Sequence, residues 1–206
     1  MRILVSGFEP FGGLSTNPTL ELINKAKNFE IEGVDIDTIQ LPVVYRECTP
    51  PLLEKINEWQ PDIVICLGVA VGCSSINLER VGINVEDTVG EGRNGDNNGD
   101  RPVDRPIVNN GPEGLFSTLP IRLLLEKLQE SKIPSMISNT AGTYICNTTL
   151  YTVLHKIQEE SLDIKAGFIH VPATPEMISA SPEVPSMGMD TQTRALKIII
   201  ENLRGI

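Results

Sequence analysis

Strand patterns and helix patterns alternate along the chain, and this alternation restricts its possible folds more than any other feature. The run from Asp62 to Leu67 is short, apolar and β-branched, which is typical of a strand buried on both faces. The segment from Leu119 to Glu130 instead repeats its leucines at helical spacing. Further strands are expected at 1–6, 34–41, 135–139 and 165–171, with one or two within 75–87, and helices at 17–28, 51–59, 148–159 and 190–204.

This order of elements predicts an α/β fold with one open, mostly parallel sheet and helices on both of its faces. No repeat or linker divides the sequence, so a single domain over residues 1–206 is expected. In such sheets, ligands bind beyond the carboxyl ends of the strands. The loops after Ser6, Leu67, Asn139 and His170 are therefore expected to meet at one crevice.

The charge balance argues against two classes of partner. There are 17 basic and 27 acidic side chains, so the formal net charge is −10, which repels phosphate backbones and anionic lipid. Neither nucleic acid nor a membrane surface is expected as a partner. The longest nearly uncharged apolar stretch, Ile63 to Cys73, is shorter than the ~18 residues of a bilayer span. The N-terminal apolar run is also too short for a signal peptide, so a cytoplasmic location is expected.

Cysteine and histidine are too sparse to indicate a disulfide framework or a metal centre. The sequence has 4 cysteines without a Cys-x-x-Cys pair, so reduced thiols are expected. It has 2 histidines and no compact ligand spacing. No metal and no cofactor is expected.

Cys146 is the candidate nucleophile. It follows a predicted strand and a turn, at or just before the first turn of the next helix. Free backbone N–H groups and the helix dipole favour a thiolate at such a position, and they supply donors for an oxyanion. The alternative is a small buried hydrophobic residue, which is the interpretation we give to Cys66 inside its apolar strand.

A thiolate nucleophile needs a general base that later protonates the leaving amine, and histidine suits both tasks. His155 lies nine residues beyond Cys146 on the same predicted helix, about 13 Å along the axis and on the opposite side. It is therefore interpreted as a surface histidine near the helix end. His170 ends a strand at the expected crevice and is the base by elimination, with a hydrogen-bonded core histidine as the alternative.

Glu79 is the best-placed carboxylate to orient the imidazole. It lies in a mostly apolar segment after the third predicted strand, where a charged side chain needs a specific role. The alternative is a surface ion pair with Arg80 or another basic residue, which contributes little to stability.

Several sequence blocks resemble a known family of cysteine peptidases, the pyroglutamyl peptidase I or pyrrolidone-carboxylate peptidase family. The blocks are Gly7 to Gly13 with Asn17-Pro18, Phe116 to Pro120, Glu79 to Asn84, Ser138 to Asn147, and Gly167 to Pro172 with Pro175-Glu176.

The resemblance covers nearly the whole chain and implies a fold, an activity and a site. The implied fold is a single peptidase domain, an α/β/α sandwich with a mixed sheet. The implied activity is cytoplasmic hydrolysis of the amide bond after an N-terminal pyroglutamyl (5-oxoproline) residue of peptides, through a thioester acyl-enzyme. The implied catalytic triad is Glu79, Cys146 and His170. Family members are often dimers or tetramers, so a homo-oligomer is expected.

The lactam ring of such a substrate is flat, small and uncharged, so an aromatic slot suits it. Phe8, Phe11 and Tyr144 are candidates to line this slot, and the family usually has phenylalanine at the position of Tyr144. The added hydroxyl then needs a partner or contact with water. Alternatively, Phe8 and Phe11 pin their loop to the sheet. Asn17 is a further candidate binding residue, and its alternative role is to cap a helix.

The sequence departs from the family between Thr88 and Asp100. The family's usual arginine is absent there, and Arg93 is a candidate substitute.

Two other function classes remain open. One is a phosphorylase-like enzyme that binds a nucleoside or phosphate at Gly12-Gly13, which the negative charge of Glu9 disfavours. The other is an inactive module that binds pyroglutamyl peptides.

Overall fold

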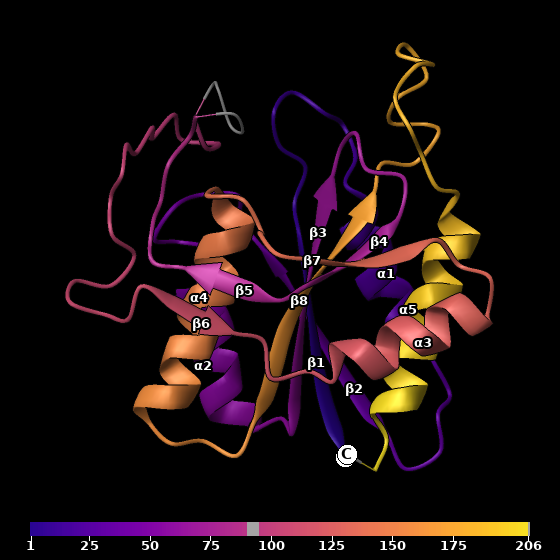
Figure 1. Ribbon diagram of the computed structural model, residues 1–206, viewed down its shortest axis with the longest axis horizontal. Coiled ribbons are helices and arrows are strands. Elements are labelled where there is room, and N and C mark those ends of the chain that lie inside the picture. Colours follow the sequence, from indigo (N-terminus) through magenta and orange to yellow (C-terminus); the bar gives the residue numbers. More distant parts are fainter. Residues whose placement is uncertain (90–94, 206) are drawn as a thin grey trace.

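The computed structural model describes residues 1–89 and 95–205, which fold around one mixed β-sheet (Figure 1). The sheet has six strands in the order β2-β1-β3-β8-β4-β7. Neighbouring strands are parallel except β8 and β4, which are antiparallel, so the predicted mostly parallel, mixed sheet is confirmed. The strands are β1 (Arg2–Phe8), β2 (Asp35–Leu41), β3 (Ile63–Ala70), β4 (Ile76–Glu79), β7 (Ser135–Ser138) and β8 (Lys165–Pro172).

Helices cover both faces of the sheet, which confirms the predicted α/β/α sandwich (Figure 1). The helices α1 (Pro18–Ala26), α3 (Ile121–Glu130) and α5 (Met189–Leu203) lie on one face, and α2 (Pro50–Trp59) and α4 (Ile145–Glu159) lie on the other. Alternate residues of each strand point to opposite faces, so each face has its own hydrophobic core. None of the described helices has the length and apolar character that a bilayer span requires.

A second, antiparallel sheet pairs β5 (Val81–Ile83) with β6 (Gly114–Phe116) beside α4. The region of β5 was predicted to contain strands, but β6 was not predicted. With three residues, β6 is too short to display a period of two in the sequence.

Two helices begin earlier than the sequence pattern indicates. Helix α4 begins at Ile145 rather than Thr148, so Cys146 lies inside its first turn. Helix α5 begins after Gly188, so Asp190 lies in the first turn and is not the N-cap.

The register of the central strands determines which side chains meet. Gly68 of β3 lies beside His170 of β8 in the parallel pair, and Asn77 of β4 lies opposite His170 in the antiparallel pair. Because alternate residues share a face, Glu79 projects to the same face of the sheet as His170. That face is the one that α2 and α4 cover.

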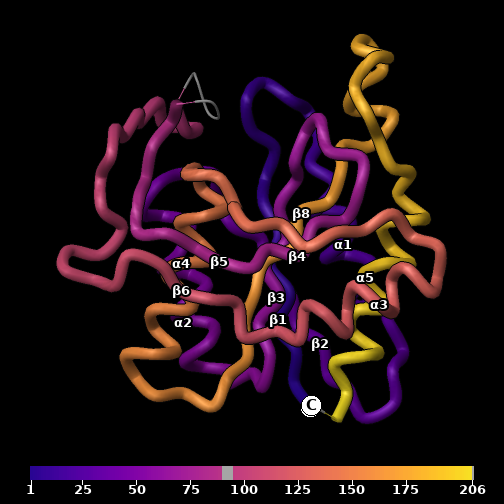
Figure 2. The backbone as a smooth tube through the Cα atoms, in the orientation of Figure 1, coloured from indigo at the N-terminus to yellow at the C-terminus, as the bar shows by residue number. Residues whose placement is uncertain are grey.

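The reversed direction of β4 and β7 changes the path of the loop after β7. The loop after β7 does not leave the sheet at the same edge as the loops after β1, β3 and β8, yet its residues Thr140 to Gly142 line the same cavity, so the expected meeting at one crevice is confirmed. This loop runs back along the molecule to the start of α4 (Figure 2).

Candidate active site

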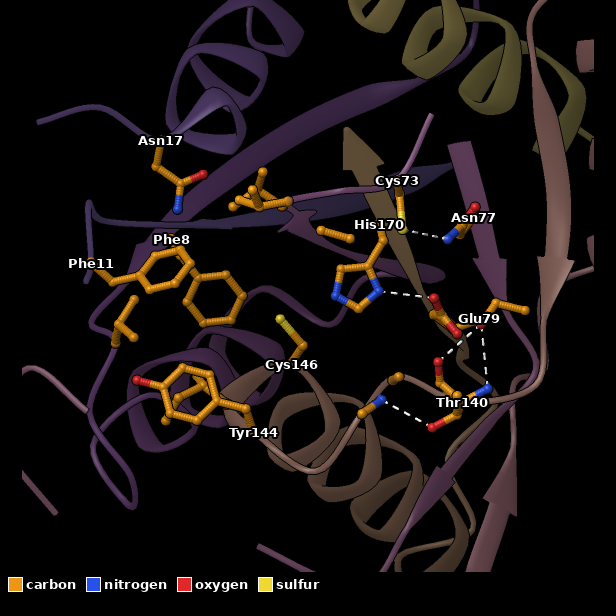
Figure 3. A pocket seen from close by; sticks show the side chains of 18 residues that line it. Phe8, Phe11, Asn17, Cys73, Asn77, Glu79, Thr140, Tyr144, Cys146 and His170 are labelled. Carbon is orange, nitrogen blue, oxygen red and sulfur yellow. Dashed lines mark hydrogen bonds and ion pairs between the residues drawn. The ribbon is translucent and has the colours of Figure 1, made fainter. Parts of the chain in front are cut away.

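A cavity of about 450 Å³ opens where the N-terminus of α4 faces the sheet, and all seven candidate site residues line it (Figure 3). They come from distant parts of the chain: the ends of β1 and β4, the loop before α1, the start of α4, and β8. Figure 3 shows the Cys146 sulfur between the aromatic side chains on one side and the His170 ring on the other. The residues are Phe8, Phe11, Asn17, Glu79, Tyr144, Cys146 and His170.

Glu79 and His170 form a buried pair. The distance between His170 Nδ1 and Glu79 Oε1 is 2.8 Å, and the two residues are 8% and 1% exposed, respectively. Glu79 is therefore not a surface residue, and the alternative of a surface ion pair with Arg80 does not fit its position. A carboxylate at Nδ1 holds the ring in one orientation and leaves Nε2 for a second partner.

That second partner is the Cys146 thiol, which also affects the pKa of the ring. Burial lowers the pKa of His170, but the negative sulfur of Cys146, its hydrogen bond to the ring, and Glu79 outweigh this effect. Together they raise the pKa of His170 from its ordinary value of 6.5 to about 10. The histidine is thus held in its protonated form between Glu79 and Cys146.

The first turn of α4 holds Cys146 in place. The first regular hydrogen bond of the helix runs from Thr148 N to Tyr144 O, so the amides of residues 145–147 precede it and point toward the N-terminal end. Asn147 anchors this turn to β5 because its side chain accepts a hydrogen bond from Ile83 N and donates to Ile83 O and Val85 O. Asn147 is not among the site residues predicted from the sequence, although a polar residue inside the apolar pattern of α4 is a signal.

Gly68 is a second residue that the sequence analysis missed. A Cβ atom at this position would lie 2.8 Å from Cys146 Sγ and 2.7 Å from two ring atoms of Phe168. The absence of a side chain therefore leaves the space that the sulfur occupies beside His170. This role can be identified only from the register in which β3 pairs with β8, and the sequence alone does not indicate that register.

Aromatic rings form the other side of the cavity. The ring centroids of Phe11 and Tyr144 are 6.4 Å apart, and Tyr45 packs edge-on against Tyr144 at 5.5 Å. Phe8 packs against Phe168 at 6.5 Å. The Tyr144 hydroxyl, which was expected to need a partner, donates a hydrogen bond to Gly95 O at 3.1 Å.

Asn17 lines the cavity and also caps α1, as its alternative interpretation predicted. Its Oδ1 accepts from Thr19 N at 3.0 Å, and its Nδ2 donates to Glu9 O at 3.0 Å. The side chain thus fixes the loop between β1 and α1 that forms one edge of the cavity.

The remaining candidates lie elsewhere. His155 is on α4, where its ring stacks on Tyr151 at 5.9 Å, and it does not line the cavity. Burial raises the pKa of the Cys66 thiol to about 12, which fits its interpretation as a core residue, and it raises the pKa of the buried Cys48 thiol to about 12 as well. Arg93 lies outside the described residues. Within residues 1–89 and 95–205, no cluster of three or more His, Cys, Asp or Glu side chains is placed to hold a metal.

A helix-terminal cysteine, a histidine and a buried carboxylate on an α/β sheet define the class of cysteine hydrolases. Comparison with known proteins narrows this class. The family model described as pyroglutamyl peptidase matches residues 1–204. The chain therefore belongs to the pyroglutamyl peptidase family, and the phosphorylase-like alternative is wrong.

Individual relatives agree with this assignment. The chain is 44% identical over 201 residues to the pyrrolidone-carboxylate peptidase of Thermococcus onnurineus, with 98% of each protein covered. It is similar to the crystal structure of Bacillus amyloliquefaciens pyroglutamyl peptidase I, with a TM-score of 0.91, 36% identity, and 97% and 95% of the two chains covered. A mutant pyrrolidone carboxyl peptidase from Pyrococcus furiosus gives a TM-score of 0.94 at 38% identity, with 100% of both chains covered.

Proposed function

We propose that this chain is a pyroglutamyl peptidase I, which hydrolyses the amide bond after an N-terminal pyroglutamyl residue of a peptide. Its family membership supports the activity. The observation that supports the mechanism most directly is the position of His170, whose ring contacts both the Glu79 carboxylate and the Cys146 thiol at the cavity wall. In this proposal Cys146 is the nucleophile, His170 is the acid and base, and Glu79 orients His170.

The first half of the reaction forms the acyl-enzyme. The Cys146 thiolate attacks the pyroglutamyl carbonyl carbon, and the carbonyl oxygen gains the negative charge. Free amides in the first turn of α4 stabilise this oxyanion. His170 then donates its Nε2 proton to the amide nitrogen, the C–N bond breaks, and the amine product leaves a thioester on Cys146.

The second half regenerates the enzyme. His170, now neutral, accepts a proton from a water molecule as the water oxygen attacks the thioester carbonyl. The C–S bond breaks, 5-oxoproline leaves, and the sulfur recovers its negative charge beside the protonated ring. Glu79 stabilises the imidazolium in both halves and keeps Nε2 directed at the sulfur.

The aromatic side of the cavity is proposed to bind the lactam ring. Phe8, Phe11 and Tyr144 supply apolar surface for a flat, uncharged group, and Asn17 fixes the loop at the edge of the slot. An aminopeptidase for ordinary substrates must instead bind an ammonium group. No acidic side chain lines the aromatic side of this cavity within the described residues, which disfavours such a cation.

The test is the release of a chromogenic amine from its pyroglutamyl amide, with and without iodoacetamide. We expect iodoacetamide to block turnover and Cys146→Ser to abolish it. Cys73→Ser is the matched control, because Cys73 is a second thiol in the same cavity and is not part of the proposed mechanism. Undiminished cleavage by Cys146→Ser would reject the mechanism.

Two further outcomes separate the alternatives. Cleavage of an alanyl amide with a free amino group at a comparable rate would reject the lactam slot. Binding of 5-oxoproline by the wild-type protein without any turnover would support the inactive binding module instead.

We also infer a cytoplasmic location and a homo-oligomer, either a dimer or a tetramer. A thiolate nucleophile together with other free cysteines suits a reducing compartment. The oligomer is inferred from the chain's membership of the pyroglutamyl peptidase family, whose members are often dimers or tetramers. Cell fractionation tests the location, and light scattering tests the oligomeric state.

Peptides with an N-terminal pyroglutamate are the proposed partners, and nucleic acid is not.

A further inference from the structure

The segment of residues 95–97 packs against the outer side of the aromatic slot. Gly95 O accepts the hydrogen bond from the Tyr144 hydroxyl at 3.1 Å. Asp96 Oδ2 accepts from Tyr45 N at 2.8 Å, and the Tyr45 ring packs edge-on against Tyr144. Residues that follow a long, polar stretch of sequence are thus attached directly to the wall of the substrate cavity.

Asn97 forms hydrogen bonds with two chain segments that border the slot. Its backbone N donates to Val43 O at 2.9 Å. Its side-chain Nδ2 donates to Glu9 Oε1 at 2.8 Å and to Pro10 O at 3.2 Å. A single residue therefore bonds to the loop after β1, which presents Phe11 to the cavity, and to the segment after β2, which presents Val43.

Glu9 also connects the loop after β1 to the segment after β2. The same Oε1 atom that accepts from Asn97 also accepts from Val43 N at 3.0 Å. The carboxylate thus shares one oxygen between the two chain segments, and a hydrogen bond to a charged acceptor is stronger than one to a neutral acceptor. Loss of the Asn97 amide would leave this oxygen with one donor fewer and would release the loop at Pro10.

We propose that Asn97 is a positioning residue that sets the distance between the Phe11 and Val43 walls of the lactam slot. The proposal rests on the proposed function, because the slot has meaning only if it binds the pyroglutamyl ring. Asn97 does not line the cavity and so touches neither the substrate nor the thiol. Its effect is on the affinity of the slot for the lactam ring of the substrate.

If Asn97 has this role, its replacement should change KM but not kcat. In Asn97→Ala the side-chain bonds to Glu9 and Pro10 are lost, so fewer bonds hold the loop that carries Phe11 against the Val43 segment, the lactam ring loses contacts and KM rises. The His170 contacts to Glu79 and Cys146 lie on the other side of the sulfur and are unaffected, so kcat stays near its wild-type value (Figure 3). A residue that only stabilised the fold would not produce this split.

The first experiment compares Asn97→Ala with Asn98→Ala. Asn98 is the matched control because it is the adjacent asparagine, is also exposed, and donates to Asp96 Oδ1 through its backbone N, which the substitution keeps. For Asn97→Ala we expect KM for a pyroglutamyl amide and the inhibition constant of 5-oxoproline to rise about fivefold, which corresponds to about 1 kcal/mol. For both variants we expect kcat and the rate of Cys146 alkylation by iodoacetamide to stay within about twofold of wild type.

A second pair of variants tests the bond to Glu9 itself. Asn97→Asp puts a carboxylate against the carboxylate of Glu9, so KM should rise further than in Asn97→Ala. In the double variant Glu9→Gln/Asn97→Asp, the new amide at position 9 can donate to the new carboxylate while its oxygen still accepts from Val43 N. This double variant should therefore bind more tightly than Asn97→Asp, although the bond to Pro10 O stays lost because a carboxylate cannot donate, and it remains informative if Asn97→Ala is unstable.

Three results would overturn the proposal: an unchanged KM in Asn97→Ala, an equal rise in Asn98→Ala, or no recovery in the double variant. A fall in kcat or in alkylation rate without a change in KM would also contradict it. These outcomes are distinct from a failure of the proposed function, which would appear as a wild-type protein that does not cleave pyroglutamyl amides.

Discussion

Replacement of Gly68 by alanine tests whether the space beside β3 is needed for catalysis. The new Cβ atom would lie 2.8 Å from Cys146 Sγ and 2.7 Å from the Phe168 ring. Heavy atoms in comfortable contact are about 3.5–4.0 Å apart, so the sulfur must move by roughly 1 Å. A displacement of about 1 Å in a reacting group can reduce the rate by about 10²-fold. We therefore expect Gly68→Ala to lower kcat by about 10²-fold and stability by about 1–3 kcal/mol.

The matched control is Gly167→Ala on β8. A Cβ atom there would collide with Ser117 Oγ and would lie 2.7 Å from Leu119 Cδ1, on the opposite face of the sheet from the sulfur. Gly167→Ala should lower the free energy of unfolding by an amount similar to that for Gly68→Ala, but it should leave kcat within a few-fold of wild type. The assays are steady-state kinetics, iodoacetamide alkylation of Cys146, and urea denaturation. A folded Gly68→Ala enzyme with wild-type kcat, or an equal loss of kcat in Gly167→Ala, would refute the reasoning.

Four further predictions concern the triad and the slot. Glu79→Gln keeps the shape but removes the charge that stabilises the His170 cation, so kcat should fall by at least about 10²-fold with little change in KM in steady-state assays. Cys146→Ser removes the sulfur that helps to raise the pKa of His170, so that pKa should be lower in the variant than in the wild type in an NMR titration, and an unchanged His170 titration would contradict this. Because folding raises the pKa of His170, this residue's contribution to stability is complete below pH 6.5 and is lost as the pH rises toward 10; denaturation midpoints measured at several pH values should fall over this range, and midpoints that stay constant would contradict the statement. Tyr144→Phe removes the hydrogen bond to Gly95 O and should lower the free energy of unfolding by about 0.5–1.5 kcal/mol, and a stability equal to wild type would contradict this assignment.

The sequence pattern was sufficient to predict most of the fold, because buried strands and amphipathic helices have local periodicity. It also led to Cys146, His170 and Glu79, since a thiol at a predicted helix start and a histidine at a strand end are local signals. The structure brings these three to one cavity, and their catalytic roles stay predictions.

What the sequence did not reveal depends on contacts between distant segments. The antiparallel direction of β4 follows from its pairing with β8, and the role of Gly68 follows from the β3–β8 register. Likewise, the contacts of Asn97 join residues separated by 88 and 87 positions in the chain. Neither propensity nor periodicity contains such information.

The reversed strand β4 also has a consequence for how the protein folds. Glu79 and His170 are 91 positions apart, and they meet only when β8 has inserted between β3 and β4. Closing a loop of this length is slow and entropically costly, so this insertion belongs to the non-local steps that limit folding rates. Enzymatic turnover during refolding should therefore lag behind the appearance of helical signal, and its onset would report the moment at which the sheet is complete.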